Sequence, residues 1–254
     1  MIRLSVITVS FNSANTISRT LKSVSYQSHK DYEHLIIDGA SSDDTLRVVD
    51  LDGQHVAKVI SEQDCGIYDA MNKGLAIATG EVVGFLNSDD AYADDAVLSD
   101  VARCFADGHV DYVYGDIQML NEAGEVVRHW RTGDIPAEGL WNTQIPHPAL
   151  FVKRSLLNSL NPAFDTSYRI SADLKQQLIL INKLGARGAY IRRPLTLMSI
   201  GGASTGGLRS YAVGWKESAR AYNEVFGGGG WWYTIKKVAS KVRGIRKIRQ
   251  FNSK

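Results

Sequence analysis

Two adjacent carboxylates, Asp89 and Asp90, directly follow an apolar run over residues 82–86 that predicts a buried strand. Carboxylates side by side at the end of a buried strand repel each other and lose solvation. A divalent cation held between them and a bound diphosphate offsets that penalty, since Mg²⁺ and Mn²⁺ prefer oxygen ligands. The pair therefore indicates a metal and diphosphate site. The alternative is that both residues only cap the helix expected over residues 96–105.

A second informative stretch, residues 61–74, reads SEQDCGIYDAMNKG. Gly66 loosens its entry, and apolar residues then recur at helical spacing, at positions 67, 71, 75 and 78. Its polar side chains include Asp64, Asp69 and Asn72. The stretch predicts a loop that opens a helix and presents acidic groups at the loop. An ordinary capped helix is the alternative.

Polar residues also follow the first two expected strands. Thr8, Ser10 and Asn12 lie where the first strand ends, and Asp38 ends the second strand at a turn. Residues 41–44, SSDD, have the Ser-x-x-acid pattern of a capping box and predict a helix start. Neither a Gly-x-Gly-x-x-Gly nor a Walker lysine motif is present, which argues against a dinucleotide-dependent dehydrogenase and a P-loop enzyme.

The 61–74 stretch and Asn87-Ser88-Asp89-Asp90 together resemble the family-two glycosyltransferases of the GT-A type, in particular the bacterial exopolysaccharide enzymes of the colanic-acid kind. Residues 37–45, IDGASSDDT, look like that family's Asp-Gly-Gly-Ser-x-Asp-Gly-Thr box. The resemblance covers residues 1–210. It implies inverting transfer of a sugar from a nucleotide-diphosphate donor to an acceptor. The implied acceptor is a lipid-linked glycan in surface polysaccharide synthesis.

The resemblance also implies a donor site. In relatives the acid that matches Asp38 contacts the nucleobase, and Asp89, supported by Asp90, would bind Mn²⁺ or Mg²⁺. Asn87 replaces the first carboxylate of the family's Asp-x-Asp motif, so it can hydrogen-bond a ribose hydroxyl but contributes no charge. The residues implied around the nucleotide-sugar are Thr8, Ser10, Asn12, Asp38, Ser41, Asp64, Asp69, Asn72, Asn87, Ser88 and Asp89.

The implied catalytic base is Asp173, at the start of a helix expected over residues 171–184. In inverting relatives an Asp at this place removes the proton of the acceptor hydroxyl. The alternative is an acid favoured there by the helix dipole. His147 stands where relatives often carry His-Gln, and Arg209 follows a small-residue loop, 201–207. Both are candidates for acceptor or phosphate contacts, with a structural histidine and a plain linker as open alternatives.

Strands expected at 2–9, 34–37, 56–60 and 82–86 alternate with helices. This order predicts an α/β fold, and the resemblance makes it a GT-A-type, Rossmann-like mixed sheet flanked by helices, with the ligand at the carboxyl ends of the strands. Shorter strands are expected at 112–114, 126–130, 149–152 and 196–200. We expect a catalytic domain over 1–226, then a glycine hinge and a tail over 227–254 on which that domain does not depend.

The charge of the 254-residue chain is unevenly distributed. Of 29 basic and 27 acidic residues, eight basic ones lie beyond Glu224 and no acidic one does, so the rest of the chain carries a net charge of −6. Apolar residues recur every three to four positions from Trp231 onward, which predicts an amphipathic helix that binds an anionic membrane surface. A packing helix and a solvated basic tail are the alternatives. Nucleic-acid binding is not expected, because no recognised motif accompanies the charge.

The sequence shows neither a signal-peptide pattern nor an apolar stretch of the roughly 18 residues that span a membrane. Its two cysteines, Cys65 and Cys104, fit a reducing compartment, although a single bridge is left open. We expect a cytoplasmic protein, peripheral on the inner face of the cytoplasmic membrane. Two other functions stay open: a sugar nucleotidyltransferase, whose glycine- and arginine-rich first loop is missing here, and a non-catalytic assembly partner, against which the retained acids argue.

Overall fold

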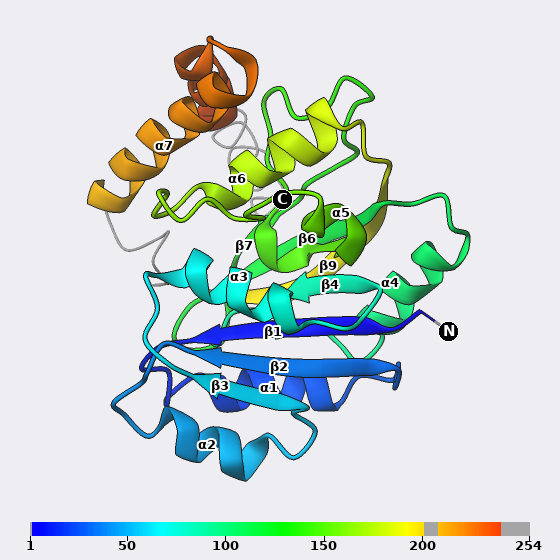
Figure 1. The fold of residues 1–254 in the computed structure, drawn as a ribbon, viewed down its shortest axis with the longest axis vertical. Helices are drawn as coiled ribbons and strands as arrows, with labels where there is room; N and C mark the ends of the chain where they lie inside the picture. Colours follow the sequence, from blue (N-terminus) through cyan, green and yellow to red (C-terminus); the bar gives the residue numbers. More distant parts are fainter. Residues whose placement is uncertain (1, 201–207, 240–254) are drawn as a thin grey trace, which may run out of the picture.

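A nine-stranded mixed sheet runs through the computed structural model, which describes residues 2–200 and 208–239 (Figure 1). The strand order is β3-β2-β1-β4-β8-β6-β9-β5, and β7 pairs with β6. The first four strands are parallel: β1 (Leu4–Ser10), β2 (Tyr32–Asp38), β3 (Lys58–Ser61) and β4 (Val82–Phe85). The others are β5 (Asp90–Tyr92), β6 (Tyr112–Leu120), β7 (Val126–Trp130), β8 (Leu150–Lys153) and β9 (Gly188–Ser199). β8 is antiparallel to β4, so the run of parallel strands ends at β4.

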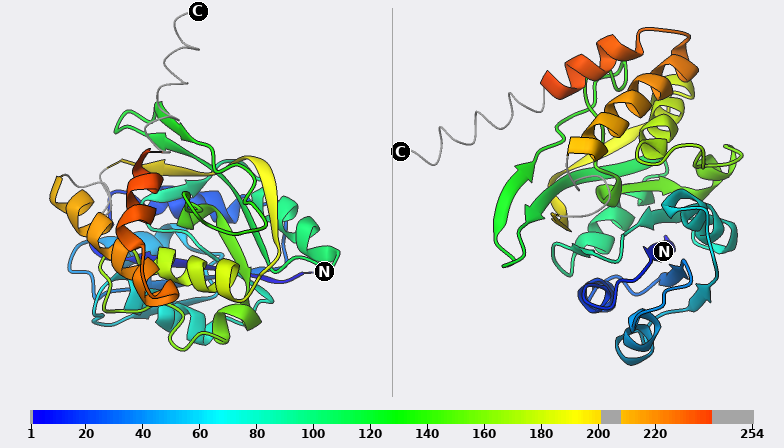
Figure 2. Two further views of the ribbon diagram at one scale, coloured as in Figure 1. Left: turned by 90° about the horizontal axis from the view of Figure 1, so that it is seen from above. Right: turned by 90° about the vertical axis from the view of Figure 1, so that its left-hand side faces the viewer.

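Helices cover both faces of this sheet (Figure 2). One face carries α1 (Ile17–Ser25), α2 (Thr45–Asp52) and α4 (Val97–Ala106), and the other carries α3 (Ile67–Ile77) and α6 (Ala172–Gln177). Because side chains alternate along a strand, β1 sends Leu4 and Val6 into one core and Ile7 and Val9 into the other. Every residue of β1 is buried, as expected for a parallel strand covered on both sides.

The later part of the chain is more helical than the sequence predicts. A short 3₁₀ turn spans His147–Ala149, α5 spans Arg154–Asn158, and α6 continues into a π-helical stretch at Leu178–Lys183. The sequence analysis misses the long helix α7 (Leu208–Phe226), whose buried face consists mainly of small residues and tyrosine. Within the described residues, no helix is long and apolar enough to cross a bilayer.

The glycines at 227–230 form a tight connection to a further helix over residues 230–239. Gly227 and Gly229 have positive φ angles of 83° and 81°, which favour glycine. A Cβ on Gly230 would lie 2.0 Å from the carbonyl oxygen of Ala219, so the second helix approaches α7 closely at a residue without a side chain. Tyr233 is buried in the main core. Residues 230–239 therefore pack on the domain, and the expectation that the domain folds without them stays a prediction.

Two local predictions also need correction. The helix expected from the capping box at residues 41–44 begins at Thr45, and Asp43 accepts the Thr45 backbone N–H at 3.0 Å, while Ser41 bonds elsewhere. The late strand expected at 196–200 is the end of β9, which starts at Gly188. The sequence does not predict the first half of β9 because Arg192 and Arg193 interrupt its apolar pattern. Their side chains leave the strand to form ion pairs.

Candidate active site

Asp38 is the centre of a hydrogen-bond network at the carboxyl end of β2. Its side chain is completely buried. Oδ1 accepts from the hydroxyls of Ser10 at 3.0 Å and Ser41 at 2.5 Å, and Oδ2 accepts from the Ser41 backbone N–H at 2.8 Å and the Ser61 hydroxyl at 2.7 Å. A carboxylate offers about four acceptor positions, and this one uses four within the chain. Asp38 thus ties together the ends of β1, β2 and β3, and its contact with a nucleobase stays a prediction.

The loop after β1 is fixed by neighbouring loops. Asn12 has a positive φ of 49°, and its Oδ1 accepts the Ser42 backbone N–H at 2.9 Å. The hydroxyls of Ser13 and Ser88 are 2.8 Å apart, which joins this loop to the turn after β4. Thr8, in contrast, is completely buried, and its hydroxyl lies 2.9 Å from Nε2 of His34. The structure therefore places Thr8 inside the protein, behind the predicted donor residues.

The turn after β4 holds buried oxygen atoms that have no hydrogen-bond partner in the described part of the chain: Oδ1 of Asn87 and Oδ1 of Asp90. Asp90 is only 1% exposed, and its Oδ2 accepts a long hydrogen bond of 3.3 Å from the Asn87 amide. Burial and the neighbouring charge of Asp89 raise the pKa of Asp90 well above its usual value, and burial raises the pKa of Asp89. An unsatisfied buried oxygen is costly, so this turn suits a cation.

The turn offers a cation oxygen ligands of the kind that Mg²⁺ and Mn²⁺ take. Asp89 is partly exposed, whereas Asp90 begins β5, seven residues before α4 starts, so the alternative that both acids cap that helix does not hold. No cluster of three His, Cys, Asp or Glu side chains suited to a metal occurs within residues 2–200 and 208–239. Asp89 and Asp90 could hold a metal together with a bound diphosphate, and this metal site stays a prediction.

The loop between β3 and α3 carries the acids predicted there. Asp64 accepts the Gly66 backbone N–H at 2.8 Å. It also packs over Gly39, where a Cβ would lie 2.6 Å from its Oδ2. This contact brings Asp64 to the end of β2, beside the Asp38 network. Asp69 turns back to its own loop and accepts the Cys65 backbone N–H at 3.0 Å.

Asn72 is used inside the protein. Its amide nitrogen donates to the carbonyl of Phe164 at 2.8 Å, and its amide oxygen accepts the Phe164 backbone N–H at 3.0 Å. Phe164 meets Phe85, the last residue of β4, edge to face, with ring centroids 5.1 Å apart. Asn72 therefore holds the aromatic group that closes the end of β4, and its contact with a nucleotide-sugar stays a prediction.

Asp173 lies at the start of α6 and is 8% exposed. Its Oδ2 accepts from the Gln144 amide nitrogen at 2.8 Å, and its Oδ1 accepts a longer hydrogen bond of 3.3 Å from the Tyr68 hydroxyl. Burial and the Asp173 charge raise the pKa of Tyr68 well above its usual value, so Tyr68 stays a neutral donor. One oxygen is thus held firmly and the other weakly, an arrangement that suits a general base.

His147 packs against the rings of Phe85 and Phe164. Its ring stacks on Phe85 with the centroids 5.3 Å apart, next to the turn that carries Asp89 and Asp90. Both ring nitrogens are buried and without a hydrogen-bond partner among the described residues. Burial lowers the pKa of His147, and the charge of Asp173 opposes that shift. The geometry presents a neutral imidazole with a free donor and a free acceptor. The side chain of the other candidate, Arg209, and the loop 201–207 lie outside the described residues.

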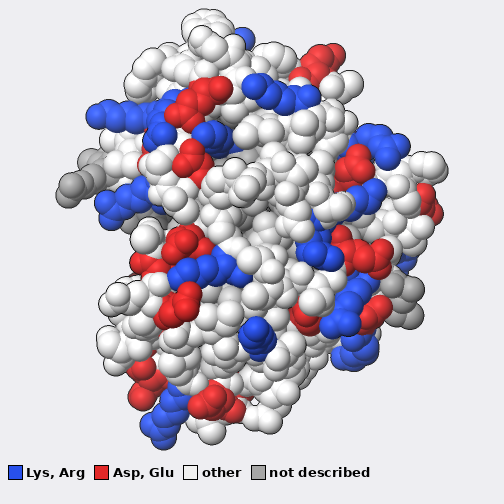
Figure 3. Space-filling model, viewed as in Figure 1, with Lys and Arg blue, Asp and Glu red and all other residues white. Residues whose placement is uncertain are grey.

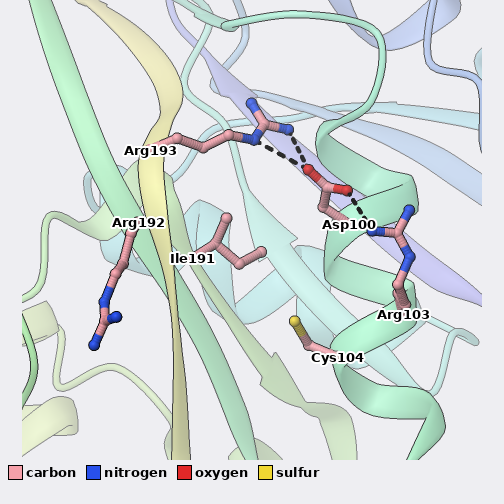
Figure 4. A pocket seen from close by; sticks show the side chains of 6 residues that line it. All are labelled: Asp100, Arg103, Cys104, Ile191, Arg192 and Arg193. Carbon is pink, nitrogen blue, oxygen red and sulfur yellow. Dashed lines mark hydrogen bonds and ion pairs between the residues drawn. The ribbon is translucent and has the colours of Figure 1, made fainter.

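A hollow of about 260 Å³ opens elsewhere, between α4 and β9 (Figure 4). The guanidinium of Arg193 bonds to Asp100 at 2.6 Å, and Arg192 points away from them. The hollow also exposes Cys104, a free thiol like Cys65, so no bridge joins the two cysteines. The residues that line it do not include any predicted site residue, and its Arg193–Asp100 pair is already satisfied. We assign it no part in donor binding.

Three residues of the site were missed by the sequence analysis: Arg19, Tyr68 and Gln144. Arg19 donates to the carbonyl of Asp89 at 2.5 Å and to Ser199 at 2.6 Å, so it places a positive charge at the turn of residues 87–90. Tyr68 lies inside the 61–74 stretch, where its position one residue before Asp69 could have drawn attention to it. Nothing in the sequence marks Gln144, because its role depends on a contact with a residue 29 positions away.

Comparison with known proteins identifies the family. A family model described as Glycosyl transferase family 2 matches residues 5–173. An uncharacterized glycosyltransferase of Mycobacterium tuberculosis is 34% identical over 203 residues, which are 78% of this chain and 72% of the relative. A PGL/p-HBAD biosynthesis glycosyltransferase of Mycobacterium bovis is 30% identical over 173 residues, which are 66% of each chain.

Two solved structures share the fold. S. aureus TarS 1–349 in complex with UDP-GlcNAc has a TM-score of 0.66 at 21% identity, over 87% of this chain and 67% of that chain. The mannosyltransferase PcManGT from Pyrobaculum calidifontis, in complex with GDP-Man and Mn²⁺, has a TM-score of 0.66 at 18% identity, over 96% and 75% of the two chains. The mixed sheet flanked by helices is the GT-A arrangement, and the chain belongs to glycosyl transferase family 2.

Proposed function

We propose that this protein transfers a sugar, with inversion, from a nucleotide-diphosphate donor to a hydroxyl of a glycan acceptor. The observation that supports it is that the fold holds two buried carboxylates, Asp90 and Asp173, each with an oxygen that is unpartnered or weakly hydrogen-bonded. The turn at residues 87–90 has unpartnered oxygens that suit a metal-bound diphosphate, and Asp173 is a buried carboxylate with one weakly held oxygen. A site that only binds a nucleotide would not need a general base such as Asp173.

The donor half of the site would hold the nucleotide at the ends of β1 to β4. Asp38, Asp64 and the loop after β1 would surround the base and ribose, with Asn87 within reach of the sugar hydroxyls. Asp89 and Asp90 would hold Mn²⁺ or Mg²⁺, and when bound the ion supplies charge neutralisation for the departing diphosphate. Arg19 adds a fixed positive charge beside the same turn.

In the acceptor half, Asp173 would act as the base. Its Oδ1 takes the proton of the acceptor hydroxyl while that oxygen forms a bond to the anomeric carbon. The bond from the anomeric carbon to the diphosphate breaks on the opposite face, and the nucleoside diphosphate leaves with that electron pair. His147, which has no hydrogen-bond partner among the described residues, would donate to the acceptor or to the diphosphate.

The ligands of the two solved structures suggest two classes of sugar donor to test first. TarS was solved with UDP-GlcNAc and PcManGT with GDP-Man and Mn²⁺, so UDP- and GDP-linked hexoses are the first candidates. The M. bovis relative takes part in PGL/p-HBAD biosynthesis. A lipid-linked glycan of a surface polysaccharide is our proposed acceptor.

We infer that the protein works at the inner face of the cytoplasmic membrane. On the face drawn in Figure 3, basic and acidic side chains lie interspersed, whereas the basic excess of the sequence lies past Glu224. The helix over 230–239 leaves Trp231, Trp232 and Ile235 more than half exposed. Exposed tryptophans next to a basic segment suit anionic lipid headgroups. Removal of residues 240–254, which spares the packed helix, should weaken sedimentation with anionic vesicles.

The experiment for the proposed activity is a comparison of Asp173→Asn with wild type. We expect the variant to bind UDP or GDP with Mn²⁺ as wild type does, and to lose transfer by about 100-fold or more, because Asn keeps the shape and removes the base. Release of UDP from UDP-GlcNAc or of GDP from GDP-Man measures turnover, and calorimetry measures binding.

A matched control is Asp165→Asn, in the loop before α6, whose carboxylate pairs with Lys175 at 2.7 Å and has no predicted part in chemistry. Near wild-type turnover in Asp173→Asn would place the base elsewhere. Pyrophosphate chemistry in the wild type would favour a nucleotidyltransferase, and absence of nucleotide binding would favour an assembly partner.

A further inference from the structure

The helix over residues 230–239 buries a lysine in the interface with the catalytic domain. Lys237 is 6% exposed. Its Nζ donates to the Ser218 hydroxyl of α7 at 2.7 Å and to Oε1 of Gln144 at 3.2 Å. A buried amine is costly compared with a methionine or leucine of similar size. Burial alone therefore does not explain a lysine at this position.

Gln144 connects this lysine to the predicted base. Its Oε1 accepts from Lys237, and its Nε2 donates to Oδ2 of Asp173 at 2.8 Å. The three residues come from positions 29 and 93 apart in the chain, so only the folded protein brings them together. They form a chain of hydrogen bonds that runs from the helix after the glycines to the carboxylate of Asp173.

The lysine supports one of the two orientations of the Gln144 amide. An amide can rotate by half a turn with little change in shape, but its oxygen only accepts and its nitrogen only donates. An ammonium group can only donate, so it keeps the amide oxygen on its own side. The amide NH₂ is then directed to Asp173. The carboxylate of Asp173 only accepts and favours the same orientation, because the flipped amide would place its oxygen against the carboxylate; without the lysine, only Asp173 would favour it.

We propose that Lys237 and Gln144 are positioning residues for Asp173, so that the helix over residues 230–239 completes the catalytic site. This inference rests on the proposed role of Asp173 as the base. Lys237 fixes the orientation of Gln144, and Gln144 holds Oδ2 of Asp173. The other carboxylate oxygen, Oδ1, is thereby left to face the acceptor hydroxyl.

The test uses the full-length protein and two variants that separate positioning from packing. Lys237→Met keeps the length of the side chain and removes the donor. Gln144→Glu keeps, and strengthens, the contact with Lys237 but cannot donate to Asp173. A role limited to packing predicts that Gln144→Glu stays active. Our proposal predicts that both variants lose kcat by about 10- to 100-fold, the scale of a misplaced catalytic group, with the KM for UDP-GlcNAc or GDP-Man unchanged.

Tyr233→Phe is the matched control, because it lies on the same helix. It removes the hydrogen bond of 2.9 Å from the Tyr233 hydroxyl to the carbonyl of Thr143, next to Gln144, and leaves the Lys237 contact in place. We expect Tyr233→Phe to keep kcat near the wild-type value, whatever its effect on thermal stability. Equal losses of kcat in Tyr233→Phe and Lys237→Met would overturn the proposal.

A second measurement needs no sugar donor. The side-chain NH₂ resonances of Gln144 in a ¹H–¹⁵N spectrum should shift in Asp173→Asn and in Lys237→Met, and stay in place in Tyr233→Phe. If Lys237→Met leaves them unchanged, the lysine does not orient the amide and the proposal fails, whatever the reaction is. If they shift as expected but Asp173→Asn stays active, the hydrogen-bond chain exists and the proposed base is wrong. The two failures are therefore distinguishable.

Discussion

Asp38 and Asp90 lie at the same edge of the same sheet, and both are buried, yet their surroundings are opposite. Asp38 accepts four hydrogen bonds, from the ends of β1 and β3 and from its own turn. Asp90 has one oxygen with a long hydrogen bond from Asn87 and another without a partner in the described residues. The first carboxylate is satisfied by the fold, whereas the second is not.

Two buried histidines repeat the contrast. His34 has both ring nitrogens in contact, Nε2 with the Thr8 hydroxyl and Nδ1 with Nε2 of His55, each at 2.9 Å. His147 has neither nitrogen hydrogen-bonded within the described chain. Native proteins rarely leave a buried polar atom unpaired, so an unpaired one deserves an explanation. We conclude that the satisfied pair supports the fold, and that the unsatisfied pair is where a ligand would supply the missing contacts.

The largest expected effect comes from the turn at residues 87–90, where we propose that a metal binds. Asp89→Asn should leave the fold intact and lower metal-dependent turnover by about 100-fold or more, since a metal supplies several kcal/mol to a departing diphosphate. Calorimetry of UDP and GDP with and without Mn²⁺ checks the binding step. Affinity that is unchanged and still Mn²⁺-dependent in the variant would reject the metal role of Asp89.

Asp90→Asn sharpens the same prediction. The charge of the Asp90 carboxylate is poorly satisfied, and the variant exchanges it for a neutral amide of the same shape. The metal-free protein should therefore become more stable by about 1 kcal/mol. Binding of Mn²⁺ with UDP or GDP should become weaker at the same time. A variant that loses stability instead would show that Asp90 is a satisfied structural residue, like Asp38.

Asp38→Asn should show the opposite behaviour, with a loss of about 2 to 3 kcal/mol in the free energy of unfolding. The amide nitrogen cannot accept, so two of the four donors lose their acceptor inside the protein. Urea denaturation measures the loss. Ser61→Ala removes one of the four bonds and should cost about 1 kcal/mol or less, which provides a graded control. Equal stability of Asp38→Asn and wild type would end the distinction between the two carboxylates.

The donor half of the site was predictable because its signals are local. Strand ends, turn residues and the 61–74 stretch lie in short segments, so sequence patterns place Asp38, Asp64 and Asp89 correctly at one edge of the parallel strands. The sequence does not reveal which of these acids already has partners within the chain. That Asp38 is satisfied depends on Ser10 and Ser61, which come from other strands.

The acceptor half was predictable only in part. Asp173 follows from a short motif, but Gln144 and Lys237 reach it through contacts between distant segments, and no spacing rule relates them. The glycines at 227–230 predict a hinge. They do not predict that the next helix returns to pack Tyr233 and Lys237 against the domain. Helix α7, which provides that surface, was missed because its buried face is mostly small residues and tyrosine rather than an aliphatic stripe.

The smallest effect is the contribution of His34 to the pH dependence of stability. Burial, helped by the proximity of His55, lowers the pKa of His34 to about 3, below the ordinary value of 6.5. The unfolded chain therefore binds a proton that the folded one does not, and stability falls as the pH drops below 6.5. Between pH 6.5 and 5.5 this residue should account for about 1 kcal/mol of that fall. His34→Gln should flatten the profile of urea stability against pH over this interval.

His147→Gln should lower turnover more than stability, since no hydrogen bond within the described chain is lost. Parallel stability profiles for wild type and His34→Gln, or a His147→Gln variant that is less stable but keeps full turnover, would contradict the contrast between satisfied and unsatisfied groups.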